Sequence, residues 1–286
     1  MHWGRVVLHS LMLVILFLLA AIFVNPLTDG IGNNTIRIVV KEVSRIGLTI
    51  GMLLWYGKFF LKKSSAYFRV GNLIVMGRVW VLVGLIMPIT VITFYVLSQY
   101  VVFQGLETHS IKTIVTFIIS SFITACSAGV IEEILFRGYL LKLFEDKWNT
   151  ITAVSVTSIL FSALHLLTMN GLRFIDVCLV LIAGTMAGIM FSLIVYKSGS
   201  VWNAVIVHVI WNFFMSSKII QFVPIFGSNT SSLVKLTFSS DRFWITGGSF
   251  GIEAAFPVIV LYILIICWII FYKTDFFKKN YTYKGK

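Results

Sequence analysis

Apolar residues in this chain occur in runs long enough to cross a lipid bilayer, which takes about 20 residues of helix. The runs cover residues 6–24, 46–61, 79–102, 114–143, 151–169, 174–196, 201–217 and 254–272. Lys58 interrupts the second run near its end, and the fourth is long enough to extend beyond the hydrocarbon. The pattern predicts an all-α, polytopic membrane protein of about eight transmembrane helices, with residues 1–286 forming one integral-membrane domain.

The composition agrees with a membrane location. Hydrophobic residues make up 58% of the chain and charged residues 12%, against about 25% charged residues in a typical soluble domain. The net charge is +12, but the basic residues gather at the ends of apolar runs, which indicates membrane topology and argues against a nucleic-acid partner. The three cysteines fall within apolar stretches and show no C-x-x-C spacing, so we expect small buried side chains.

The distribution of Lys and Arg predicts the orientation in the cell membrane. With eight spans both termini share one side, and that side collects more Lys and Arg than the opposite one. The positive-inside rule then places both termini in the cytoplasm. No A-x-A type site follows the first run, which favours a retained signal anchor. The longest polar connection, residues 218–253, is predicted to be an external loop.

The fourth run carries charged residues, which are costly inside a bilayer. Glu132, Glu133 and Arg137 lie there, and each such group costs at least about 2.5 to 3.5 kcal/mol on insertion scales. On an α-helix Glu133 and Arg137 stand four residues apart on one face and can form an ion pair. Glu132 points about 100° away, which leaves its carboxylate for another role.

Further polar side chains occur in the fifth and seventh runs, at His165, His208 and Asn212. His208 and Asn212 are four residues apart and share a helical face, and helix lengths allow both histidines to reach the depth of Glu132. A single intramembrane His or Asn often only bridges two helices, and a Glu–Arg pair can simply fix helix positions. Together these groups exceed what packing requires, so we expect a functional site.

Hydrolysis is the chemistry that suits this set of groups. A carboxylate beside a second carboxylate in a low-dielectric environment binds a proton more readily than in water, so it can take one from water near neutral pH. An imidazole opposite the carboxylate can hold that water. The oxyanion formed by attack on a carbonyl needs N–H donors, which His208 and Asn212 can supply. The residues therefore predict a water-activating hydrolase inside the bilayer.

The motifs Glu132-Glu133-x-x-x-Arg137, Phe161-x-x-x-His165 and His208-x-x-x-Asn212 occur in this order. They resemble the CPBP family of intramembrane proteases, which includes CAAX-prenyl endopeptidases and bacteriocin-processing or immunity proteins. The resemblance covers residues 114–217, which would form the catalytic core. It implies peptide-bond hydrolysis, in which Glu132 is the general base, His165 is its partner, and His208 and Asn212 are the oxyanion donors. Glu133, Arg137 and Phe161 would support the site.

Several alternatives remain open at this point. Glu132, His165 and His208 are also a possible zinc-ligand set, although we favour a site with no metal and no cofactor because the chain has no H-E-x-x-H motif. The protein could instead be a non-catalytic immunity protein or receptor that binds a bacteriocin or signalling peptide, or a transporter with a carboxylate proton relay. For a protease, we expect the substrate to be a peptide precursor, a prenylated-type C-terminus or a membrane protein. The sequence does not predict the oligomeric state.

Overall fold

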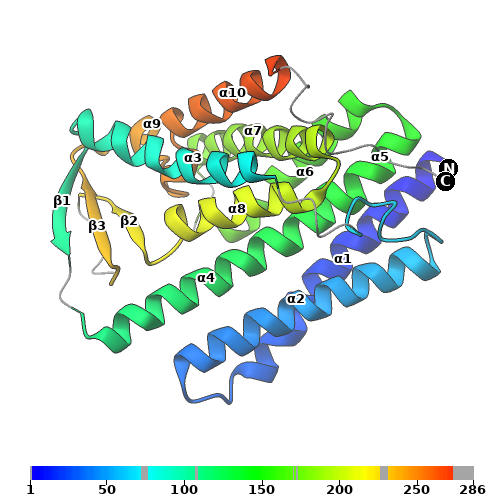
Figure 1. Cartoon of the computed structure of the whole chain (residues 1–286), viewed down its shortest axis with the longest axis horizontal. Helices are drawn as coiled ribbons and strands as arrows, with labels where there is room; N and C mark the ends of the chain where they lie inside the picture. The colour runs from blue at the N-terminus through cyan, green and yellow to red at the C-terminus, as the bar shows by residue number, and fades with distance from the viewer. Residues whose placement is uncertain are drawn as a thin grey trace.

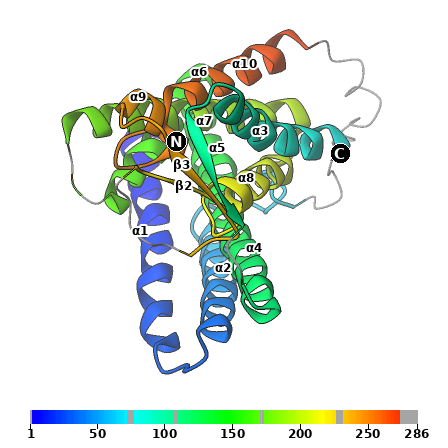
Figure 2. The ribbon, with the colours of Figure 1, turned by 90° about the vertical axis from the view of Figure 1, so that its left-hand side faces the viewer.

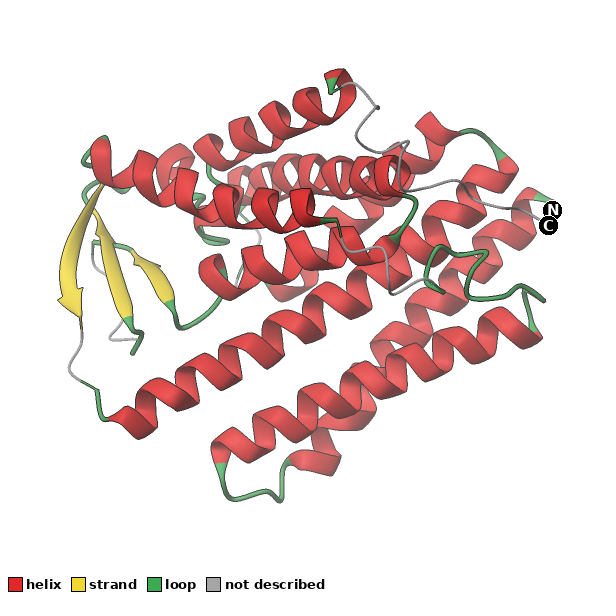
Figure 3. Ribbon diagram, in the orientation of Figure 1, coloured by secondary structure: helices red, strands yellow, loops and turns green. Residues whose placement is uncertain are grey.

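The computed structural model describes residues 2–71, 77–106, 109–169, 171, 173–225 and 231–272. Within these ranges the chain is mostly helical, as Figure 3 shows. The long helices are α1 (Trp3–Thr28), α2 (Asn34–Phe59), α3 (Arg78–Leu97), α4 (Ile111–Glu133), α6 (Thr150–His165), α7 (Phe174–Ser198), α8 (Val201–Met215) and α10 (Phe256–Phe271). Each of the eight predicted apolar runs overlaps one of these helices.

Five helical segments of the described chain are long and apolar enough to cross a membrane. They are Trp3–Thr28, Arg78–Leu97, Ile111–Lys147, Thr150–Thr168 and Phe174–Ser198. Helices α8 and α10 are apolar but shorter. The predicted run 46–61 forms the second half of α2, whose first half carries Arg37, Lys41, Glu42 and Arg45. A multi-pass membrane protein follows from these helices, while the number of eight spans and the cytoplasmic termini stay predictions. The basic residues from 273 onward that enter the topology prediction lie outside the described residues.

Helix boundaries follow from local capping and turn chemistry. The Asn33 side chain accepts hydrogen bonds from the N–H groups of Thr35 and Ile36 at the start of α2, and Asn149 caps α6 in the same way. Gly199, with a φ of 72°, ends α7 in the left-handed conformation that favours glycine, and Ser200 caps α8 directly after it. The turn between α7 and α8 is therefore short, which keeps these two helices antiparallel neighbours.

The fourth predicted run is not a uniform α-helix. Helix α4 continues into a π-helical segment, η1 (Ile134–Leu140), and then into α5 (Leu141–Lys147). All seven residues of η1 are buried, and segments of this kind occur frequently at functional sites. The wider turn begins directly after Glu132 and Glu133, so the two carboxylates lie at the point where the helix changes its winding.

A small sheet accompanies the helices, which otherwise form the mostly helical fold that the sequence predicted. Strands β1 (Val101–Leu106), β2 (Ile220–Val223) and β3 (Val234–Phe238) form a sheet in the order β1-β3-β2, with β1 antiparallel and β2 parallel to β3. The sheet lies at one end of the helices (Figure 1). The predicted third run ended at Val102, but α3 ends at Leu97 because Gln99, at a φ of 57°, turns the chain toward β1.

The described residues of the connection between α8 and α10 are folded, which corrects the prediction of a loop, while its external location stays a prediction. It contains β2, β3, the short helix α9 (Phe243–Thr246) and the 3-10 turn η3 (Ile252–Ala254). The pairing between β1 and β3 joins segments more than 100 residues apart in the sequence, which local sequence patterns do not reveal. Because this segment is folded, η3 is held at the start of α10.

Helix α8 lies inside the bundle. In Figure 2 it is placed between α4 and the group formed by α3, α7 and α10, while α1 and α2 extend along the other side of α4. Val201, Ala204 and Val207 on α8 are fully buried. This position brings the face of α8 that carries polar residues against the junction of α4 and η1.

Candidate active site

Glu133 and Arg137 form a buried ion pair, as their spacing predicted. Oε1 of Glu133 lies 2.9 Å from Nη1 of Arg137, and the side chains are 0% and 1% exposed. The guanidinium group also lies 4.2 Å from the centre of the Phe161 ring and 5.2 Å from that of Phe191. Burying two charges is costly unless they are well paired, and the aromatic rings add a cation–π attraction. Phe161 therefore contacts the site as a support for Arg137.

His208 is held by the same carboxylate. Its Nδ1 lies 2.9 Å from Oε1 of Glu133, and its ring stacks on Phe191 with centroids 4.8 Å apart. Because an ionised carboxylate only accepts hydrogen bonds, Nδ1 of His208 carries the proton of this bond. Nε2 is then directed away from Glu133, and it lies 4.0 Å from Oε2 of Glu132.

His165, the last residue of α6, approaches Glu132 from another helix. Its Nδ1 donates a hydrogen bond to the carbonyl oxygen of Phe161 over 2.8 Å. In the neutral imidazole this leaves Nε2 as an acceptor. Nε2 of His165 also lies 4.0 Å from Oε2 of Glu132, so the two imidazoles are equally distant from one carboxylate oxygen.

The close approach of α6 and α7 fixes the position of His165. A Cβ atom on Gly188 would lie 2.7 Å from Cβ of Ser158, and one on Gly184 would lie 2.6 Å from Oγ of Ser162. Such distances leave no room for a side chain at either glycine. The two glycines therefore let α7 approach α6, the helix that ends in His165.

Glu132 differs from Glu133 in its surroundings. Its side chain is 20% exposed, and its Oε2 atom is buried without a hydrogen-bond partner among the described residues. A separation of 4.0 Å from each imidazole is too long for a direct hydrogen bond but suits one bridging water. The predicted division between a paired Glu133 and an available Glu132 agrees with this geometry.

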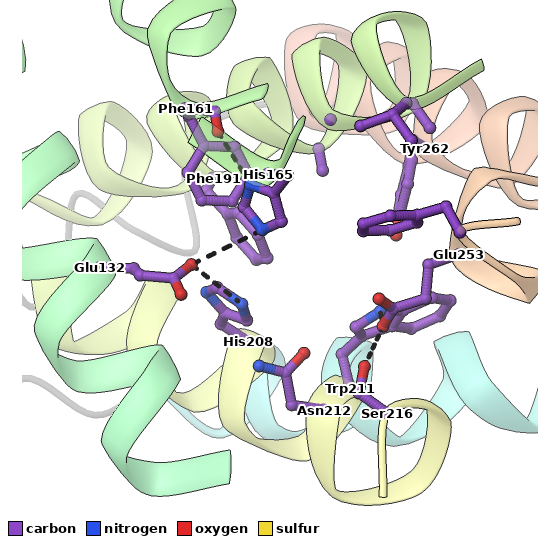
Figure 4. Close-up of a pocket in the computed structure, with 15 residues that line it drawn as sticks. Glu132, Phe161, His165, Phe191, His208, Trp211, Asn212, Ser216, Glu253 and Tyr262 are labelled. Carbon is purple, nitrogen blue, oxygen red and sulfur yellow. Dashed lines mark hydrogen bonds and ion pairs between the residues drawn. The ribbon is translucent and has the colours of Figure 1, made fainter. Parts of the chain in front are cut away.

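The polar groups face a cavity of about 160 Å³. Glu132, His165, His208 and Asn212 line it (Figure 4). The structure thus brings the four predicted catalytic residues together around one space, with Glu133 and Arg137 directly behind them. A second cavity of about 360 Å³ shares Asn212 with the first and extends along α4 past Ser120 and Thr124.

The sequence analysis missed the opposite wall of the cavity. This wall is formed by Glu253 of η3, Trp211 of α8, Ser216 directly after α8, and Tyr262 of α10. Glu253 falls in the segment that we predicted to be an external loop. Its position directly before the last apolar run was the one signal of membrane depth that the sequence offered.

The residues also bear on the zinc alternative. Glu132, His165 and His208 present one carboxylate oxygen and two ring nitrogens to a shared space, which is a chemically suitable donor set for zinc. The described part of the chain contains no group of three or more His, Cys, Asp or Glu residues arranged closely enough to hold a metal ion. Zinc binding by these three residues would therefore require the donors to move closer together.

The comparison with protein families agrees with the motifs. Residues 114–214 match the family model described as Rce1-like, Type II CAAX prenyl endopeptidase Rce1-like. The match covers about a third of the chain and contains all seven residues that the sequence analysis assigned to the site. The predicted resemblance to the CPBP and CAAX protease family is confirmed by this match. No curated protein and no solved structure shows significant similarity to the chain.

Proposed function

We propose that this multi-pass membrane protein, whose residues 114–214 form an Rce1-like domain, is an intramembrane endopeptidase that uses Glu132 to activate water. One observation carries the proposal. Oε2 of Glu132 is buried and lies 4.0 Å from Nε2 of both His165 and His208, at the edge of a cavity. A carboxylate with this geometry can hold a water molecule and take its proton.

The reaction begins with the water bound between Glu132 and His165. Glu132 removes one proton while the water oxygen forms a bond to the carbonyl carbon of the substrate, and the carbonyl oxygen becomes an oxyanion. The tetrahedral intermediate then breaks its C–N bond, and Glu132 returns the proton to the leaving nitrogen. The carboxylate is regenerated, so each cycle consumes one water and one peptide bond. His165 orients the water because its Nε2 accepts a hydrogen bond when Nδ1 donates to Phe161.

The oxyanion needs hydrogen-bond donors placed in advance. Asn212 supplies an amide N–H from the same face of α8 as His208, and both line the cavity. Since Nδ1 of His208 donates to Glu133, donation from Nε2 requires the imidazolium form. The buried carboxylate of Glu133 stabilises that form, as an acidic residue behind a catalytic histidine does in hydrolytic triads.

The substrate in this proposal is a peptide segment that enters the membrane domain. The family description points to the C-terminus of a prenylated protein, while a peptide precursor and a membrane protein fit the same chemistry. The cavity that shares Asn212 with the site provides room for the chain on one side of the scissile bond. An immunity protein or receptor that binds a bacteriocin or signalling peptide is the non-catalytic alternative.

Comparison of protein termini tests the proposal. Cells that carry the parent chain, Glu132→Gln or Glu145→Gln are matched for membrane abundance, and their protein termini and released peptides are compared by mass spectrometry. Glu145 is a suitable control because it pairs with Arg69 and Lys142 away from the cavity. We expect specific termini to disappear with Glu132→Gln and to persist with Glu145→Gln. If no termini depend on Glu132 while the physiological effect persists, the protein binds rather than cleaves.

A further inference from the structure

A third carboxylate faces the cavity from the side opposite Glu132. Glu253 belongs to η3, directly before α10, and lies outside the segment that matches the family model. Figure 4 shows Glu132 with the two histidines on one wall and Glu253 with Trp211 and Ser216 on the other. A substrate that occupies the space between these walls would contact both.

Among the residues that the structure describes, the groups that donate hydrogen bonds to Glu253 are neutral. Nε1 of Trp211 donates to its Oε1 over 2.8 Å, and the hydroxyl of Ser216 donates to the same oxygen. The other oxygen, Oε2, receives no hydrogen bond from the described residues, and no Lys or Arg among them forms an ion pair with Glu253. The carboxylate is therefore oriented by its surroundings while its charge is left without a counterion in this part of the chain.

The neighbouring aromatic side chains suit a cation. Trp211 and Tyr262 are 3% and 4% exposed and both line the cavity. Their ring centroids lie 5.6 Å apart, next to the carboxylate in Figure 4. Aromatic faces attract Lys and Arg side chains, more strongly where water is excluded, and they also pack against the apolar stems of these side chains.

The segment that carries Glu253 is tightly fixed. Gly247 and Gly248 have φ values of 78° and 65°, and a Cβ atom on Gly248 would lie 2.0 Å from Oδ1 of Asp176. Ser249 donates a hydrogen bond to the fully buried Asp176 over 2.7 Å. This contact anchors the turn before η3 to the start of α7, so the cavity wall that carries Glu253 is preorganised.

We propose that Glu253, with Trp211 and Tyr262, binds a cationic group of the substrate, a Lys or Arg side chain or an amino group close to the scissile bond. The partly buried carboxylate of Glu253 is stabilised when an opposite charge arrives. The substrate cation completes the ion pair, and this contact sets which bond of the substrate reaches Glu132. The inference rests on the proposed peptidase function and names the substrate feature that the site selects.

A randomised peptide library is the probe that tests this inference. Purified parent protein and Glu132→Gln, each in lipid vesicles, are incubated with the library, and the residues around each cut are read by mass spectrometry. Cuts that Glu132→Gln no longer makes are assigned to the site. Glu253→Gln, Glu253→Lys and the control Glu145→Gln are treated in the same way. Two synthetic peptides from the best cut sequence, with Lys or Met at the selected position, then give the ratio of their kcat/KM values within each variant.

The parent protein and Glu145→Gln are expected to enrich Lys and Arg near the cut. Glu253→Gln should lower the Lys-to-Met ratio of kcat/KM values on the order of 30-fold, because the bound substrate would cover this carboxylate and loss of one partner of a covered charge pair has an effect of at least that size. Glu253→Lys should shift the preference toward Asp and Glu. Because the ratio compares two substrates of one variant, a loss of folded protein cancels from it.

Two results would overturn the inference and are distinguishable from failure of the proposed function. Cuts that depend on Glu132 but show no enrichment of Lys or Arg would leave the peptidase intact and remove the cation site. An unchanged Lys-to-Met ratio in Glu253→Gln would mean that the carboxylate only joins α8 to η3. Absence of any Glu132-dependent cut would instead reject the peptidase, and the cation site with it.

Discussion

Nδ1 of His208 lies 2.9 Å from Oε1 of Glu133, so a carboxylate at the end of α4 determines which nitrogen of an imidazole on α8 faces the cavity. The same oxygen accepts a hydrogen bond from Arg137 over 2.9 Å. Arg137, Glu133 and His208 therefore form one connected unit, and Glu132, the adjacent residue in sequence, is left to face the cavity. The arrangement separates a buried, paired glutamate from one that lines the cavity.

Glu133→Gln is expected to reduce both stability and activity. The substitution leaves Arg137 buried without its counterion, which commonly costs about 3 to 5 kcal/mol, and it removes the negative charge behind His208. Glu132→Gln should abolish cleavage with little loss of folded protein. Unfolding midpoints in detergent and membrane abundance check this difference. Glu145→Gln is the control, because Glu145 is partly exposed and its substitution should lower the free energy of unfolding by at most about 1 kcal/mol. Equal destabilisation by Glu132→Gln and Glu133→Gln would contradict the division of roles.

Phe161→Leu is expected to destabilise the protein through Arg137. The ring lies 4.2 Å from the guanidinium carbon and 4.6 Å from the ring centre of His165, and a desolvated cation–π contact contributes about 2 kcal/mol or more. Phe271→Leu is the matched control because Phe271 is 80% exposed at the end of α10. Thermal unfolding of the two variants gives the comparison. A midpoint for Phe161→Leu no lower than that of the control would refute a supporting role for the ring.

Gly188→Ala is expected to separate α6 from α7. The new Cβ would lie 2.8 Å from Cα of Ser158, and overpacking of this kind typically costs about 1 to 3 kcal/mol. Gly51→Ala places a methyl group on α2 where no atom lies within 4 Å, so its effect should be neutral or stabilising by up to about 1 kcal/mol. Unfolding midpoints and the rate of peptide cleavage check both variants. Retained cleavage and stability in Gly188→Ala would show that α6 can shift without displacing His165.

Asn212→Ala is expected to lower kcat without raising KM. Loss of one oxyanion donor typically reduces kcat by about 10²- to 10³-fold, because the hydrogen bond forms only as charge develops on the carbonyl oxygen. Steady-state kinetics with a peptide substrate identified by the termini comparison provide the measurement. A raised KM with kcat unchanged would assign Asn212 to substrate binding instead.

Metal removal separates the two hydrolytic mechanisms. If Glu132 acts without a metal, purified protein should retain cleavage after dialysis against a chelator, and its zinc content should fall far below one ion per chain. The zinc alternative predicts the opposite: loss of cleavage, recovery on adding zinc, and reduced zinc content in His165→Ala and His208→Ala. Elemental analysis of the same preparations used for kinetics decides between the mechanisms.

Much of the fold was predictable because it depends on local properties of the sequence. A run of about 20 apolar residues must form a helix in a bilayer, since every backbone polar group needs an internal partner there. The ion pair between Glu133 and Arg137 was also predictable, because four residues of helix bring the two side chains to one face. The same reasoning separated Glu132 from Glu133 and placed His208 and Asn212 together.

Contacts between segments that are distant in the sequence were determined by the tertiary structure alone. The sequence contains no signal that joins β1 to β3, or that brings Glu253 across the cavity from Glu132. The tautomer of His208 depends on a carboxylate 75 residues away, and the π-helical turn after Glu133 depends on packing around buried residues. Local periodicity determines which face of a helix a residue occupies, whereas the partner of that face is determined by how the helices pack against one another.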